Sequence, residues 1–187
     1  MALAFDASSV YSANGTGSFT FNHVPVAAPR AVVVQIAQNV NTADNISAVT
    51  YGALTLTRVA GATVFHTAGA EDGAIYTYVG TTGIPTGNQT ISVTATAASG
   101  VKDAACVTYT GAVDTQVEGV NVLDTANCAQ NAAVTIVCRA GVPALAQGAL
   151  QSGENAASVM TRVTGWTQIQ ELYVVNQGFS FQRLTTR

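Results

Sequence analysis

The sequence predicts an all-β protein, an antiparallel β-sandwich with jelly-roll-like connections and about ten to twelve strands. Short runs rich in Val, Ile, Thr and aromatic residues recur along the chain, separated by Gly, Pro and Asn signals for turns. Several runs alternate apolar and polar residues, which is the period of a strand with one buried face. In the stretch 48–60, two such runs flank Gly52-Ala53, where the glycine supplies the positive φ of a two-residue hairpin turn. The 187 residues suit one domain, 1–187, with residues 1–15 available as an N-terminal arm.

The first strands follow from local pattern. Leu3–Tyr11 is expected at a sheet edge. Ser18–Val24 places Phe19 and Phe21 on one face of a half-buried strand. The run Arg30–Ala37 is short, apolar and β-branched, which is typical of a central buried strand.

After the hairpin turn, Leu54–Val59 is expected to continue as one strand, with its leucines on one face. In the expected strand Ala74–Val79, Tyr76 and Tyr78 share the face opposite the aliphatic residues. Two further strands are expected in this half, at Val64–His66 and Gln89–Thr96.

The second half continues the same pattern. Ala144–Leu150 fits either a helix or a strand, and we favour a strand because Pro143 precedes it and Gly148 lies inside it. Thr115–Gln130 is polar and irregular and is expected to be a surface loop. The other expected strands are Lys102–Tyr109, Ala132–Cys138, Val159–Val163, Trp166–Leu172 and Gly178–Leu184.

Charge is scarce: only 9% of the residues are charged, against about 25% in an average domain. Either part of the surface is covered by other subunits, or hydroxyl and amide side chains keep it soluble. The net charge is −3, and Lys102 and six scattered arginines form no basic stripe, which argues against nucleic-acid binding. No apolar run is long enough for a membrane helix, and MALAFDASSV lacks the features of a signal peptide. Starting at Met1, the chain is expected to be made and kept, or assembled, in a cytosol.

Three cysteines, Cys106, Cys128 and Cys138, form no C-x-x-C pair. We expect reduced, buried thiols, with a disulfide as the alternative.

Several segments together resemble a β-sandwich module that recurs in structural proteins of tailed phages and in bacterial surface proteins. The segments are Arg30–Val34, Val49–Leu56, Ile75–Val79, Gly87–Val93, Val107–Asp114 and Gly165–Ile169. The resemblance covers nearly the whole chain and implies a fold rather than a set of catalytic residues. In surface proteins the module usually lies in a long multidomain chain behind a signal peptide. Neither feature is visible in this sequence, so we expect a phage virion protein.

The resemblance therefore implies a non-enzymatic virion protein, a capsid decoration or cement subunit assembled in the host cytoplasm. Its expected partners are major capsid or tail proteins and copies of itself, with the arm Met1–Ser12 and strand edges making contacts. A symmetric oligomer such as a trimer suits this role. The alternative is a tail-tip or fibre domain that binds cell-surface carbohydrate.

No pattern predicts catalytic, cofactor-binding or metal-binding residues, and we expect no enzyme activity. His23 and His66, the latter near Glu71-Asp72, are a weak metal pattern, and surface or hydrogen-bonded histidines are favoured. No local signature of a Ser-His-Asp site is present. Loop aspartates could hold calcium but are expected to be turn and cap residues: Asp44, Asp72, Asp114 and Asp124. Aromatic residues that could stack on sugars are expected mainly in the core: Tyr11, Tyr51, Tyr76, Tyr78, Trp166 and Tyr173.

Overall fold

The computed structural model describes residues 4–14, 17–39, 44–66, 73–96, 101–111, 145–152, 167–174 and 177–185. Within these ranges the chain forms strands and turns and no helix, which confirms the predicted all-β class. From residue 145 onward only the backbone is described.

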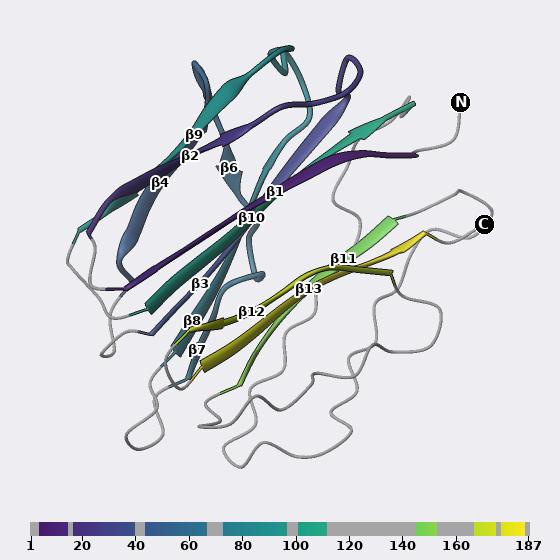
Figure 1. Cartoon of the computed structure of the whole chain (residues 1–187). Helices are drawn as coiled ribbons and strands as arrows, with labels where there is room; N and C mark the ends of the chain where they lie inside the picture. The colour runs from purple at the N-terminus through teal and green to yellow at the C-terminus, as the bar shows by residue number, and fades with distance from the viewer. Residues whose placement is uncertain are drawn as a thin grey trace.

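Two antiparallel sheets face each other as a β-sandwich (Figure 1). The larger sheet has the order β1-β10-β3-β8-β6, with β7 also paired to β8. Its strands are β1 (Ala4–Asn14), β10 (Val101–Thr110), β3 (Ala31–Asn39), β8 (Gly73–Gly80), β6 (Thr57–Arg58) and β7 (Val64–His66). The smaller sheet has the order β2-β9-β4-β5. Its strands are β2 (Phe19–His23), β9 (Gln89–Ala95), β4 (Ile46–Tyr51) and β5 (Leu54–Thr55). The chain crosses repeatedly between the two sheets, so each sheet joins segments far apart in sequence.

The predicted hairpin is present, but the strand after it is divided. Gly52 has φ 57°, and Tyr51 pairs with Leu54 across the turn. Leu56 then turns into the core, and the next two residues, Thr57 and Arg58, pair with β8 of the other sheet. The prediction of one strand over Leu54–Val59 was therefore wrong, because this run bridges the two layers at their shared margin. The division adds one strand, and the described residues hold thirteen strands in all.

The core lies between the two sheets and is built from alternate residues of each strand. Tyr76 and Tyr78 point into it together, as the alternation in β8 predicts. Gly80 ends the same strand, where a Cβ atom would lie 2.8 Å from Leu56 Cδ2, so no larger residue fits without movement. Other members of the core are Phe19, Val32, Val34, Ile36, Ile46, Val49, Tyr51, Ile91, Val93 and Cys106.

A third sheet covers the outer face of the larger one (Figure 1). It has the order β11-β13-β12, with β11 at Leu145–Ser152, β13 at Gln177–Thr185 and β12 at Thr167–Val174. β12 lies against β1 and β10, and β11 lies against β3 and β8. On the covered face, Ala31, Val107 and Tyr109 form a second buried cluster. The central strands β3 and β10 are thus buried on both faces, which explains the unbroken apolar run in β3.

Other sequence predictions can be checked against these strands. The choice of a strand over a helix for Ala144–Leu150 is confirmed by β11. The expected N-terminal edge strand is β1, which pairs with β10 along its length, so an arm that reaches a neighbour stays a prediction. Cys106 is a buried free thiol, as expected, and burial raises its pKa. Several predictions lie outside the described residues: the strands Ala132–Cys138 and Val159–Val163, the loop Thr115–Gln130, Cys128 and Cys138.

Candidate functional site

Two networks of polar side chains lie at opposite edges of the sandwich. One links β4 to β6 at one edge, and the other lies at the opposite edge, in the seam where the edge strands β1 and β2 meet. The first uses its polar groups to hold the sheets together, whereas the second orders a chain of proton donors and acceptors.

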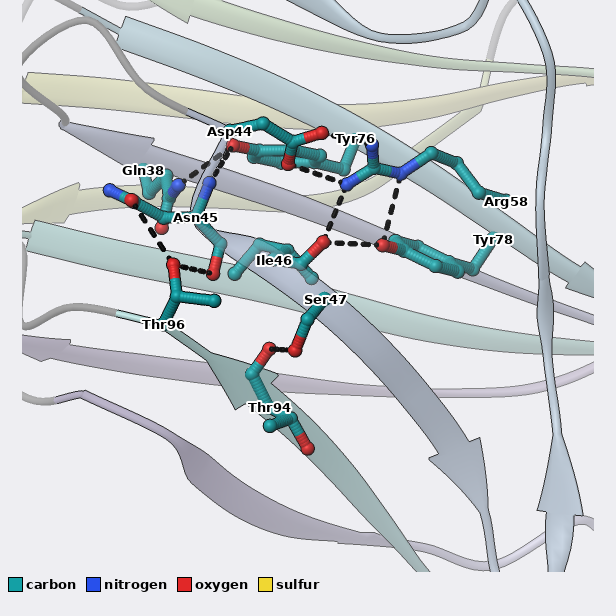
Figure 2. A network of polar contacts seen from close by, with 10 residues as sticks. All are labelled: Gln38, Asp44, Asn45, Ile46, Ser47, Arg58, Tyr76, Tyr78, Thr94 and Thr96. Carbon is teal, nitrogen blue, oxygen red and sulfur yellow. Dashed lines mark hydrogen bonds and ion pairs between the residues drawn. The ribbon is translucent and has the colours of Figure 1, made fainter.

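Arg58 is the centre of the first network, shown in Figure 2. Its guanidinium donates to both carboxylate oxygens of Asp44, one at 2.7 Å, and to the backbone oxygen of Ile46 at 2.6 Å. Its Nε donates to the Tyr78 hydroxyl at 3.1 Å, and that hydroxyl donates to the same Ile46 oxygen at 3.1 Å. The guanidinium also lies 5.0 Å from the ring centroid of Tyr76. This Arg58 clamp therefore ties β6 and β8 of one sheet to β4 of the other.

An open groove of about 480 Å³ lies beside the clamp, and Asp44, Ser47, Thr55, Arg58 and Tyr78 are among its lining residues. The hydrogen bond from Arg58 lowers the pKa of Asp44 and keeps the carboxylate charged. Most guanidinium donors are already used, so the groove offers little free chemistry.

The second network is centred on His23, whose side chain is fully buried at 0% exposure. Its Nε2 lies 3.0 Å from the Thr108 hydroxyl of β10, and its Nδ1 lies 3.1 Å from the Ser9 hydroxyl of β1. The Thr108 hydroxyl in turn donates to Asp6 Oδ2 at 2.9 Å. Four side chains from three strands are thereby linked in one chain of hydrogen bonds.

Simple chemistry assigns the protons in this chain. Thr108 has one hydroxyl hydrogen and uses it on the Asp6 carboxylate, so its oxygen can only accept from His23 Nε2–H. Burial lowers the pKa of His23, against the opposing effect of Asp6, so the ring is neutral and carries one hydrogen. Nδ1 is therefore bare and accepts the hydrogen bond that Ser9 donates.

A β-bulge positions the acidic end of the chain. The register of β1 on β10 shifts between Phe5 and Ala7, so Asp6 is the extra residue and its side chain is redirected. Its carboxylate accepts hydrogen bonds from the backbone N–H of Val26 at 3.2 Å and of Ala27 at 2.9 Å. The Asp6 carboxylate is thus hydrogen-bonded both to the loop after β2 and to Thr108.

Aromatic rings line the seam next to the polar chain. Tyr11 stacks on Phe19 with ring centroids 4.4 Å apart and on Phe21 at 5.8 Å. Tyr11 and Phe21 are half-buried, and each lies two residues along its strand from Ser9 or His23, on the same face. The seam therefore combines a flat apolar wall with an ordered hydroxyl.

Two other buried polar groups have no hydrogen-bond partner in the part of the chain that the structure describes. One is the Tyr51 hydroxyl, on a ring 5.9 Å from that of His23. The other is the Asp103 carboxylate, and burial raises its pKa to about 6, while the Ser12 hydroxyl opposes the shift without reaching hydrogen-bond geometry. Next to it, Lys102 is also buried and donates to the Gly17 oxygen at 2.6 Å.

The structure places the predicted candidates as follows. His23 is a hydrogen-bonded histidine, as favoured, and Asp44 is engaged by Arg58. Tyr51, Tyr76 and Tyr78 belong to the core, which confirms the favoured interpretation. Among the described residues no group of three or more His, Cys, Asp and Glu side chains could hold a metal ion. Tyr11 is half-buried and packs against the core. The side chains of His66 and Tyr173 are not described, and the other candidates lie outside the described residues: Glu71, Asp72, Asp114, Asp124 and Trp166.

Sequence reasoning missed Ser9, Asp6 and Thr108. Thr108 and Asp6 are 102 positions apart, and Ser9 and His23 are 14 apart, so no local spacing announces the group. Only the pairing of β1 with β10, and the seam between β1 and β2, bring them together.

A comparison of the chain with protein-family models, curated proteins and solved structures found no match. Within the described ranges, no helix has the length and apolar character needed to cross a membrane.

Proposed function

We propose that the protein is a structural protein of a tailed-phage virion, a decoration or cement subunit that adheres to the capsid and to copies of itself. The family resemblance of the sequence supplies the virion setting. The observation that carries the adhesive role is a fastened apolar loop between β2 and β3.

This loop, residues 24–30, exposes Val24 at 58% and Val26 at 84%. It is held in its middle and at its end: Asp6 accepts from the amides of Val26 and Ala27, and Arg30 N donates to the Tyr109 backbone oxygen at 2.7 Å. No charged side chain interrupts residues 24–29. Burying one valine contributes about 1.5–3 kcal/mol, and a loop that is already ordered loses little entropy on binding. The loop is therefore suited to insertion into an apolar site on a neighbouring subunit.

The test is the number of copies in purified particles of a phage whose genome encodes the chain, measured by quantitative mass spectrometry. Hundreds of copies are expected for a capsid subunit. Absence from the particles overturns the proposal.

Val26→Asp should abolish rebinding of the purified protein to particles stripped of it, because it places a charge in the buried contact. Ala53→Asp, at the exposed hairpin turn on the other edge, is the matched control and should rebind normally. Equal rebinding of both variants would show that the loop is not the adhesive surface.

The alternative role is a tail-tip domain that binds carbohydrate. It has less support, because three of the tyrosines that could stack on sugars are buried: Tyr51, Tyr76 and Tyr78. It is distinguished by about three to twelve copies per particle and by tight binding on a glycan array.

A further inference from the structure

We propose that Ser9 is an activated nucleophile and that the β1–β2 seam is an acylation site for small activated esters that carry a flat apolar group. This inference goes beyond the structural role and does not depend on it. It rests on the chain Ser9, His23, Thr108 and Asp6.

The first argument is the direction of the hydrogen bonds. Ser9 donates its hydroxyl hydrogen to the bare Nδ1 of His23, at 3.1 Å, which is the relation of a nucleophile to a general base. The opposite ring nitrogen donates to Thr108 at 3.0 Å and so holds the ring in the tautomer that leaves Nδ1 free to accept.

The second argument is electrostatic. When His23 takes the proton of Ser9, its ring becomes positively charged in a buried place. Asp6 compensates for that charge through Thr108, and its own position is fixed by two backbone amides. Thr108 is thus a positioning residue that links the base to the carboxylate.

The third argument is access. Ser9 is half-buried whereas His23 is fully buried, so the nucleophile is the more accessible of the two and the base is shielded from water. Tyr11 and Phe21 flank it on the same side of the seam and offer flat rings for an aryl or unsaturated acyl group. The neutral wall favours uncharged substrates.

The reaction balances without a further reactant. The Ser9 oxygen forms a bond to the carbonyl carbon, and its proton passes to His23 Nδ1. The bond from the carbonyl carbon to the leaving oxygen breaks, and the leaving group takes the proton from Nδ1. The products are acyl-Ser9 and an alcohol, and water can later release the acid by the same route.

The test treats the full-length protein with a biotinylated alkyl fluorophosphonate, which bonds to an activated serine through phosphorus and releases fluoride. The modified residue is mapped by tandem mass spectrometry. We expect labelling at Ser9, lost in Ser9→Ala and unchanged in Ser8→Ala, an exposed serine on the opposite face of the same strand.

Thr108→Val should slow labelling of Ser9 by about 100-fold, and Thr108→Ser should restore it, because general-base assistance of this kind contributes about 100- to 10,000-fold. The wild-type rate should rise with pH and level off below the ordinary His pKa of 6.5, since burial lowers the pKa of His23. Circular dichroism of each variant confirms that it folds.

Three results would overturn the proposal. One is labelling of Ser9 no faster than that of Ser8 in the wild-type protein. Another is equal labelling in folded Thr108→Val and wild type, and the third is a wild-type rate that falls as the pH rises from about 5 to 8. None of these results bears on the copy number in particles, so failure here leaves the structural role untouched.

Discussion

The Arg58 clamp predicts that one arginine contributes far more stability than its salt bridge. Arg58→Met keeps the apolar stem but removes the donors to Ile46, Tyr78 and Asp44. The bonds to the Ile46 oxygen and the Tyr78 hydroxyl are partly buried, and we assign each about 1–1.5 kcal/mol, below the usual charged value because the arginine is 30% exposed. The pair with Asp44, whose side chain is 46% exposed, adds only about 0.2–1 kcal/mol. The expected loss in the free energy of unfolding is about 2–4 kcal/mol.

The matched variant is Asp44→Asn, which removes the ion pair and leaves the other two bonds in place. It should cost no more than about 1 kcal/mol, and about 0.5 M salt should remove most of that difference. The assay is urea denaturation followed by far-ultraviolet circular dichroism, at low and high salt. If Asp44→Asn costs as much as Arg58→Met, the surface ion pair joins the sheets, and the reasoning from the buried acceptors is refuted.

Three further stability predictions follow from buried groups, all measurable by chemical or thermal denaturation. Asp103→Asn should stabilise the protein at pH 8 and change its stability little at pH 4. The Asp103 pKa is raised to about 6, so the folded state favours the protonated acid. The wild type should therefore lose up to about 3 kcal/mol of stability as the pH rises from about 4 to 6. A stability of the wild type that is flat across this window would contradict it. Tyr51→Phe should be neutral or stabilising by about 1 kcal/mol, because the buried Tyr51 hydroxyl has no partner among the described residues. Tyr78→Phe should cost about 1–2 kcal/mol, because the Tyr78 hydroxyl bonds to Arg58 and to the Ile46 oxygen. The reverse order of the two effects would be evidence against these hydrogen bonds. Gly80→Ala should cost about 1–3 kcal/mol through its contact with a leucine 2.8 Å away, while Gly17→Ala, with open space around it, should cost far less.

The low charge of the chain has a structural counterpart. The single lysine is buried, and Arg58 is committed to the clamp. Two of the few cations therefore add little charge to the surface.

Local sequence determined the strands and the faces that they bury. Alternation in β8 and β9 is visible in neighbouring residues, because a strand sends successive side chains to opposite sides. The turn at Gly52 is equally local, since its positive φ depends on one residue lacking a Cβ atom.

Only the tertiary structure decided what those strands join. The passage of Leu54–Arg58 from one sheet to the other depends on where the sheet margins meet, and the third sheet depends on pairings late in the chain. The bulge at Asp6 likewise arises from the register of β1 on a strand about a hundred residues away. His23 could be recognised from sequence as a histidine near a strand end, but Ser9, Thr108 and Asp6 could not be assigned to it. Hydrogen bonds act over about 3 Å in space, and nothing in the order of residues records which distant strands approach so closely.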